Sequence, residues 1–404
     1  MKIGILTYHA ACNFGANLQV LSTYMYLKNT GHHPIIINWM TQDLEQQYIK
    51  SVPKEQVIEH EYFRNSFLEL TDRCYTSEDV ANIILREQIE SIIVGSDAVV
   101  QHHPILSRIV FPTRHIFDII KVTPDTLFPN PFWGEFSTSL KSPIKMAMMS
   151  VSSQNSNFRL IPKSVKSKMR VALSKFSYIS TRDDWTSKMF RNITNNSFSP
   201  IVTPDPVFAF NLNVAEIPSK EDILNKYSLP DQYYLVSFHN QSAVSVSWLN
   251  DFKKQSLDKG IVPIALPFPK GITFKHPFDK EIPLPLSPID WYCLLKYSSG
   301  YIGHNMHPIV ICLHNSVPCF SFDNYGILRF RLFADYKSSK IYHLMKLYNL
   351  LDNWCSAKGF FYSSPSVGYV LEKLESFDTK KVGQISESRA KDYFEMMNNI
   401  ISVL

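Results

Sequence analysis

Short apolar segments alternate with helical patterns in this sequence, and the alternation starts at the first residues. Residues 2–7 have the composition of a buried strand, and residues 16–28 predict a helix that stops at Gly31. Residues 33–39 form the next apolar segment. A strand, a helix and a strand in direct succession form a βαβ unit, which requires a parallel sheet. Because the same alternation resumes near Tyr233, we expect an α/β fold built from two such series.

A stretch rich in Asn, Ser and Pro, residues 192–200, separates the two series. We expect residues 1–198 and 199–382 to form two Rossmann-like, doubly wound domains that face each other across a cleft. The Pro-rich residues 101–143 predict an irregular excursion near the site. Residues 383–404 predict a C-terminal helix, for which a path back across the first domain is one option. Ligands of such sheets bind beyond the carboxyl ends of the strands.

Composition narrows the classes of function. Hydrophobic residues make up 45% and charged residues 19% of the chain, which excludes wholesale disorder. The formal net charge of +5 is small and dispersed. We therefore expect no nucleic-acid partner, whereas anionic ligands or a loose contact with an acidic membrane face remain compatible. The six cysteines form no CxxC pair and favour reduced thiols in a cytoplasm. No signal peptide or membrane span is expected.

Two polar clusters follow predicted strands of the first series. Asn13 and Gly15 precede a helix, where a glycine lets a ligand approach the amide nitrogens. The alternative is a tight turn with a helix cap. Ser96 and Asp97 end a buried segment, and Asp97 is placed to act as a general base or to bind a hydroxyl group. The alternative is that Asp97 caps the next turn.

Two further clusters carry a basic side chain. Arg182 follows a strand and is suited to clamp a carboxylate or phosphate, although it would alternatively pair with Asp183, the expected helix cap. Pro308 suits the first position of a helix and puts His307 at the mouth of that helix. There the dipole favours an anion, and an imidazole that titrates near neutrality can pass a proton. His304 fits a packed histidine, and a metal site with His307 lacks a third ligand.

These clusters, in this order, resemble the polysaccharide pyruvyl transferase family. Residues 13–19 match its Asn-x-Gly-Ala-x-Leu-Gln loop, and residues 94–97 match its Val-Gly-Ser-Asp strand end. Its Ser-x-Arg-(Asp/Glu) strand end and its Asp-Pro segment correspond to residues 180–183 and 204–206. Residues 305–322 match its (Arg/Ser)-x-His-Gly turn and the short strand that follows.

The resemblance, which extends over residues 1–325, implies two domains similar to those of GT-B glycosyltransferases. It implies transfer of a pyruvyl group from phosphoenolpyruvate to a sugar, which gives a cyclic pyruvate ketal. The acceptor would be a cell-surface polysaccharide precursor, lipid-linked in many members, at the inner face of the membrane. Localisation is then cytoplasmic, and peripheral membrane contact and the oligomeric state stay open. No cofactor and no metal are implied.

Carried onto this chain, the resemblance makes His307 the catalytic acid and Arg182 a ligand of phosphoenolpyruvate. Asp97 is the expected base or hydroxyl-binding group. The remaining candidate substrate-binding residues are Asn305, Asn13, Gly15 and Ser96.

Two positions depart from the family turn. Asn305 stands where the family often has Arg, and Pro308 stands at the usual Gly. Because the first change removes a fixed positive charge, we expect another cation, Lys270 or Arg329, to take its place. Two alternative functions stay open: a GT-B glycosyltransferase that uses a nucleotide sugar, and a non-catalytic relative of the fold.

Overall fold

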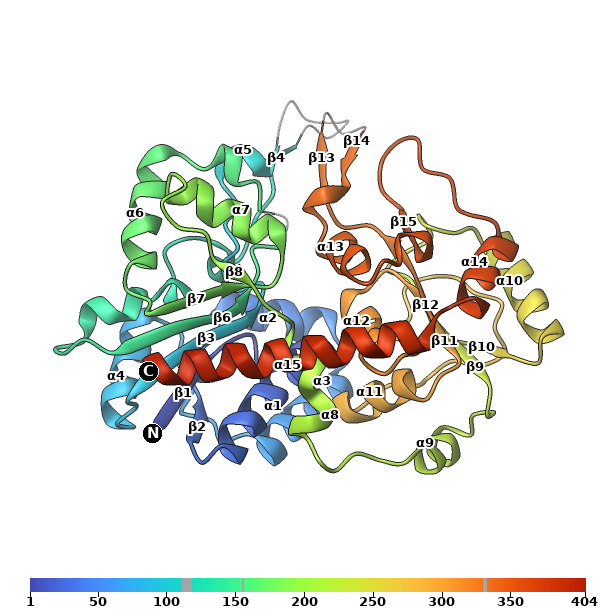
Figure 1. Cartoon of the computed structure of the whole chain (residues 1–404), viewed down its shortest axis with the longest axis horizontal. Coiled ribbons are helices and arrows are strands. Elements are labelled where there is room, and N and C mark those ends of the chain that lie inside the picture. Colours follow the sequence, from blue (N-terminus) through green and yellow to red (C-terminus); the bar gives the residue numbers. More distant parts are fainter. Residues whose placement is uncertain (111–117, 155, 330–332) are drawn as a thin grey trace.

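Two parallel sheets frame the computed structural model, which describes all residues except 111–117, 155 and 330–332 (Figure 1). The N-terminal sheet has the order β2 (His33–Ile36), β1 (Lys2–Leu6), β3 (Ser91–Asp97), β6 (Lys145–Val151), β7 (Tyr178–Thr181) and β8 (Ile201–Val202). The C-terminal sheet has the order β10 (Val262–Ala265), β9 (Tyr233–Ser237), β11 (Gly300–Gly303), β12 (Cys319–Asp323) and β15 (Trp354–Ser356). All neighbouring strands in both sheets are parallel. The expected α/β fold with two Rossmann-like halves is confirmed.

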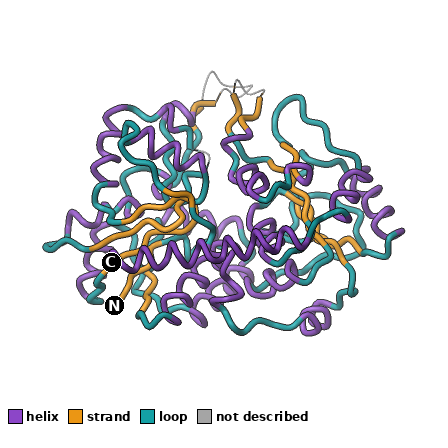
Figure 2. Tube along the Cα trace, in the orientation of Figure 1, coloured by secondary structure: helices purple, strands orange, loops and turns teal. Residues whose placement is uncertain are grey.

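Helices surround both sheets (Figure 2). Those of the N-terminal half are α1 (Phe14–Asn29), α2 (Gln42–Ser51), α3 (Lys54–Phe67), α4 (Ser77–Arg86), α5 (Ile105–Arg108), α6 (Lys163–Leu173) and α7 (Asp184–Ile193). The second half contributes α8 (Phe210–Asn213), α9 (Lys220–Tyr227), α10 (Val246–Asp258), α11 (Pro288–Lys296), α12 (Met306–His314), α13 (Lys340–Leu347), α14 (Val367–Glu375) and α15 (Thr379–Val403). Two short hairpins, β4–β5 (Ile109–Val110, Asp118–Ile119) and β13–β14 (Ile327–Arg329, Phe333–Asp335), complete the strands.

One hydrophobic core runs through both halves. Alternate residues of a strand point to opposite faces of its sheet. Ile3 and Ile5 of β1 therefore lie on one face, and they belong to the same buried cluster as Tyr233 and Leu235 of β9. The opposite faces of the two sheets pack into separate clusters within each half. The shared cluster fixes how the two sheets sit relative to each other.

The two helices that begin at the cleft are buried on nearly every side. In α1 the buried residues run from Phe14 to Leu27 with one break, and in α12 they run from Met306 to Leu313. A helix that is apolar all round belongs in a protein interior. Both helices lie in the shared core, so their N-termini are held by packing from both halves.

The excursion at residues 101–143 contributes a cluster of aromatic side chains to the core of the N-terminal half. It contains α5, the β4–β5 hairpin and three short 3₁₀ helices. Phe132, Trp133 and Phe136 are at most 1% exposed, and the Phe132 ring lies 4.9 Å from that of Tyr8. These aromatic side chains therefore stabilise the sheet. Only a few polar residues of this segment reach the cleft.

Helix α15 spans both halves of the molecule (Figure 1). It leaves the C-terminal half beside α12 and ends across β6 and β7 of the N-terminal sheet. The Met396 sulfur lies 3.3 Å from Ser150 Oγ, and Tyr26 of α1 donates a hydrogen bond to Asn398. Neither α15 nor any other helix in the described part of the chain combines the length and apolar character of a membrane span.

The packing of α15 leads to a first prediction. Met396→Ala should lower the free energy of unfolding by about 2–5 kcal/mol, because it leaves a cavity at a fully buried position. Asn399→Ala, on the exposed side of the same helix, should change it by less than about 0.5 kcal/mol. Urea unfolding of both variants tests this, and equal losses would show that α15 contributes little through its buried face.

Candidate active site

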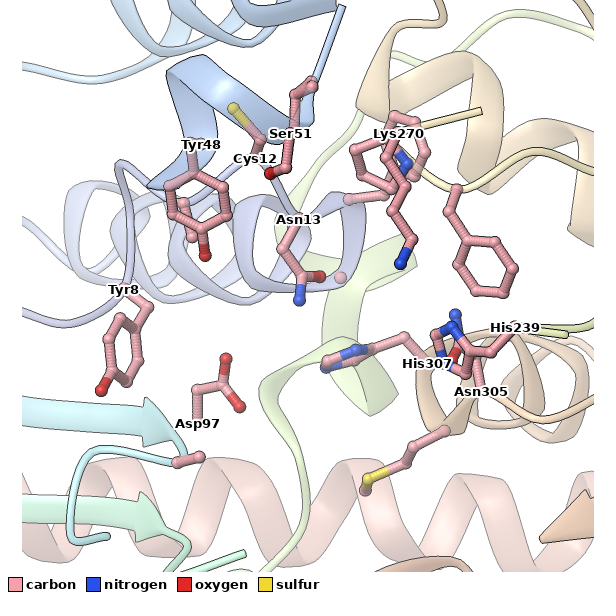
Figure 3. A pocket seen from close by; sticks show the side chains of 18 of the residues that line it. Tyr8, Cys12, Asn13, Tyr48, Ser51, Asp97, His239, Lys270, Asn305 and His307 are labelled. Carbon is pink, nitrogen blue, oxygen red and sulfur yellow. The ribbon is translucent and has the colours of Figure 1, made fainter. Parts of the chain in front are cut away.

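A cavity of about 570 Å³ lies between the two halves, and strands of both sheets point into it at their carboxyl ends (Figure 3). In each sheet the strand order changes direction at one point. This point lies between β1 and β3 in the N-terminal sheet and between β9 and β11 in the C-terminal sheet. Such switch points open a crevice in a doubly wound sheet. The lining accordingly includes Asn13 and Asp97 from one half, and His239 and His307 from the other.

Asp97 ends β3 at the cavity and is held from behind by Arg182. Its Oδ1 lies 3.2 Å from Arg182 Nη2. Burial favours the neutral carboxyl, but the positive charge of Arg182, joined by Lys340, outweighs it and lowers the pKa of Asp97 below its ordinary value. The carboxylate is therefore ionised at neutral pH. It is better suited to accept a hydrogen bond from a hydroxyl group than to remove a proton outright.

The second partner of Arg182 is the buried carboxylate of Asp205. Asp205 Oδ2 accepts hydrogen bonds from Arg182 Nη1 at 2.9 Å and from Gln19 Nε2 at 2.6 Å. Its Oδ1 accepts one from the Val207 amide at the start of a 3₁₀ helix, Pro206–Ala209. The same Oδ2 lies 4.0 Å from His307 Nε2. One carboxylate thus connects four segments that are far apart in the sequence.

His307 is packed tightly against the N-terminus of α1. A Cβ atom built on Gly15 would lie 2.0 Å from His307 Cγ, so only a glycine leaves room for this ring. The side chain is 11% exposed. Within the described structure its Nε2 is buried and has no hydrogen-bond partner. Gly15 therefore acts by admitting the histidine from the other half.

The protonation of His307 differs from the expectation of titration near neutrality. Burial lowers the pKa of His307 to about 4, against the opposing effects of Asp205 and Asp97. The imidazole is therefore neutral at pH 7. Because a nearby anion stabilises the imidazolium form, a negatively charged ligand in the cavity would raise the pKa of His307.

The N-terminus of α12 begins two residues earlier than expected. Asn305 is its N-cap, Met306 its first residue, and Pro308 stands third rather than first. A proline at this position breaks no helical hydrogen bond, because the first amides have no partner within a helix. The Asn305 side chain makes no capping hydrogen bond. The Asn13 side chain accepts a hydrogen bond from the Ala16 amide of α1. Because Asn305 makes no such bond, the first amides of α12 are left free for a ligand.

The candidate site residues divide into two groups. Those that line the cavity are His307, Asp97, Asn305, Asn13 and Gly15. Arg182 and Ser96 lie behind it: Arg182 is occupied by two carboxylates, and the Ser96 hydroxyl donates to the Ser150 carbonyl. Asp183 caps α7, as its alternative role predicted. His304 is fully buried, and its Nδ1 accepts a hydrogen bond from the His239 amide.

Several lining residues were not singled out from the sequence. Tyr8 donates a hydrogen bond to Asp125, and Tyr48 and His239 complete the polar lining. Of the two cations proposed to replace the turn arginine, Lys270 reaches the cavity, while the Arg329 side chain lies outside the described part of the structure. Lys340, beyond the last matched motif, also reaches it. Among the described residues, no three His, Cys, Asp or Glu side chains could hold a metal.

The two parallel sheets and their arrangement define a two-domain α/β fold of the GT-B type. Residues 13–325 match the profile of the polysaccharide pyruvyl transferase family. The chain belongs to this family. No curated protein shows a significant match to the sequence.

Solved structures with the same fold differ widely in sequence. MnaA of S. aureus, in a structure with UDP, is 10% identical, with 100% of this chain and 97% of that chain covered and a TM-score of 0.52. A UGT transferase from Siraitia grosvenorii in complex with UDP is 10% identical, with 100% and 99% covered and a TM-score of 0.51. The UDP-N-acetylglucosamine 2-epimerase of Rickettsia bellii is also 10% identical, with 100% and 96% covered and a TM-score of 0.50. At this identity the likeness concerns the fold alone.

The contact between Gly15 and His307 leads to a second prediction. Gly15→Ala should lower the free energy of unfolding by about 1–3 kcal/mol, because the added methyl group collides with the His307 ring. Gly368→Ala is the matched control, since Gly368 is also the second residue of a helix but has no atom within 4 Å of its built Cβ. The control should be neutral or up to about 1 kcal/mol more stable. Urea unfolding compares the two; equal effects would contradict the packing described.

Proposed function

We propose that this protein transfers the pyruvyl group of phosphoenolpyruvate to a sugar of a polysaccharide precursor and forms a pyruvate ketal. The observation that carries the proposal is the His307 imidazole, whose unpartnered Nε2 lies at a cavity between two helix N-termini. Helix N-termini favour anions such as phosphate and carboxylate. The family supports the class of reaction, and the cavity brings together a histidine, the N-termini of two helices and the Asp97 carboxylate.

In the first step His307 gives a proton to the methylene carbon of phosphoenolpyruvate while an acceptor hydroxyl adds to the neighbouring carbon. Asp97 orients that hydroxyl by accepting its hydrogen bond, takes up its proton only as the new C–O bond forms, and releases that proton to solvent afterwards. Asp205, 4.0 Å from His307 Nε2, stabilises the charged imidazolium before transfer. A second hydroxyl then displaces phosphate, closes the ketal ring, and its proton leaves with the phosphate. The products are one ketal and one inorganic phosphate.

Arg182 acts in this scheme as a positioning residue. Its guanidinium forms ion pairs with Asp97 and Asp205, and its side chain is 2% exposed. It therefore keeps the Asp97 carboxylate ionised and aimed at the cavity, while the donor is held by other groups. The acceptor class of the proposal is a lipid-linked oligosaccharide at the cytoplasmic face of the membrane, as the family implies.

A nucleotide-sugar donor is the second candidate. Two proteins with the same fold have structures with UDP, and His239 stacks on Phe268 at a ring distance of 4.3 Å at the cavity. Such a stacked pair would suit a planar base. Measuring the melting temperature with phosphoenolpyruvate or with UDP separates the two candidates. The donor that binds the folded protein should raise the melting temperature, and the other should leave it unchanged.

The third prediction concerns turnover. His307→Ala should lower the rate of phosphate release from phosphoenolpyruvate, with lipid-linked oligosaccharide acceptors, by a factor of about 10² to 10⁴, as expected for loss of a general acid. His304→Ala is the control: it lies three residues earlier and outside the cavity, so it should keep turnover per folded molecule within a few-fold. Activity of the His307 variant within a few-fold of the parent would contradict the assigned role.

The fourth prediction concerns proton uptake. Burial lowers the pKa of His307 to about 4, so if His307 is the acid of the proposed reaction, we expect its imidazole to gain a proton when phosphoenolpyruvate binds at pH 7. Calorimetric titration in two buffers of different ionisation enthalpy should show uptake of about one proton per donor bound. The uptake should vanish in His307→Ala and persist in His304→Ala. Binding with no dependence on the buffer would mean that His307 is not charged by the donor.

A further inference from the structure

Lys340 is a buried lysine at the cavity to which the proposed reaction assigns no contact with substrate. It is the first residue of α13, follows the N-cap Ser339, and is 8% exposed. It lies in the lining together with Asp97 and His307. Its position in the chain is beyond the segment that matches the family profile.

The ammonium group of Lys340 lacks a direct counterion. Among the described residues, no carboxylate lies within 4.0 Å of it. The nearby carboxylates of Asp97 and Asp205 are bound by Arg182. Its recorded neighbour is the Tyr325 ring, 5.1 Å from Nζ. The ammonium group therefore faces the cavity without an ion-pair partner, and an anion that enters the cavity can pair with it.

The surrounding charges keep Lys340 cationic without neutralising it locally. Burial, together with the positive charge of Arg182, lowers the pKa of Lys340 to about 8, although Asp97, Asp183 and Asp205 act in the opposite direction. The group is therefore mostly an ammonium ion at pH 7. Lys340 lines the same cavity as His307, at the N-terminus of α12, and its positive charge contributes to the lowered pKa of His307.

We propose that Lys340 and the first amides of α12 bind the phosphate group of the donor, and that Lys340 supplies the positive charge that Asn305 lacks in the family turn. The inference rests on the proposed function. Lysine is a common phosphate ligand because it presents a compact charge, and helix N-termini bind phosphate through free amides. Both features converge here on one cavity. Lys270 is exposed, and a solvated charge contributes less to such a site.

The test compares Lys340→Met with Lys346→Met, a change of an exposed lysine on the same helix. Calorimetry with inorganic phosphate and with phosphoenolpyruvate should show affinities about 10- to 100-fold weaker for Lys340→Met and unchanged for Lys346→Met. Pyruvate has the carboxylate but no phosphate, so its affinity should be the same for both variants. Without ligand, Lys340→Met should melt at the same or a higher temperature than the parent, because it removes a buried charge without a bonded partner.

Phosphate affinity retained in Lys340→Met, or no phosphate binding by the parent protein, would overturn the inference. A marked loss of thermal stability in ligand-free Lys340→Met would also overturn it, since Lys340 would then be a structural counterion. The proposed function is tested separately. If phosphate binds through Lys340 but phosphoenolpyruvate releases no phosphate with any acceptor, the subsite stands and pyruvyl transfer fails. If Lys340→Met binds and turns over phosphoenolpyruvate like the parent, the subsite fails and pyruvyl transfer stands.

Discussion

The buried Asp205 carboxylate accepts hydrogen bonds from Arg182 at 2.9 Å and from Gln19 at 2.6 Å. It also lies 4.0 Å from His307 Nε2. A buried anion must be compensated by charge and hydrogen bonds, or it destabilises the fold. Arg182 supplies that charge, and its second nitrogen holds Asp97 at the cavity. The motif segments, which are far apart in the sequence, are thus joined in space by one ionic network, to which each contributes a group.

The geometry of the cleft follows from a core that does not stop at the boundary between the halves. The faces of both sheets that carry Ile5 and Leu235 share one buried cluster with α1, α12 and α15. On this support the Gly15 backbone and the His307 ring, which come from opposite halves, stand in direct contact. Opening the cleft would therefore separate the histidine from the helix end beside it, so the arrangement of the site depends on the closed packing.

Much of the fold could be predicted, because a buried parallel strand appears in the sequence as a short apolar segment. The helix that follows it appears as a segment with periodic apolar residues. Strand ends also placed Asp97 and His307 at the cavity. The sequence could not predict that the Arg182 side chain turns away from the cavity. This orientation depends on an ion pair with Asp205, and in the sequence Asp205 is recognisable only as part of an Asp-Pro segment. Lys340 follows the β13–β14 hairpin and has no local signal; only its burial beside the cavity distinguishes it. The start of α12 was missed because Pro308 was expected at the first helical position, whereas it is the third residue of the helix.

Under the proposed function, the charges of the empty site explain an order of events. Arg182 is already neutralised by two carboxylates, His307 is neutral because its pKa is about 4, and Lys340 remains an ammonium ion without a bonded partner. The cavity therefore offers positive charge but no acid before the donor arrives. An entering phosphate would pair with Lys340 and, by its own negative charge, raise the pKa of His307. The acid would then be formed only beside a bound donor, so an acceptor alone would meet an unreactive histidine.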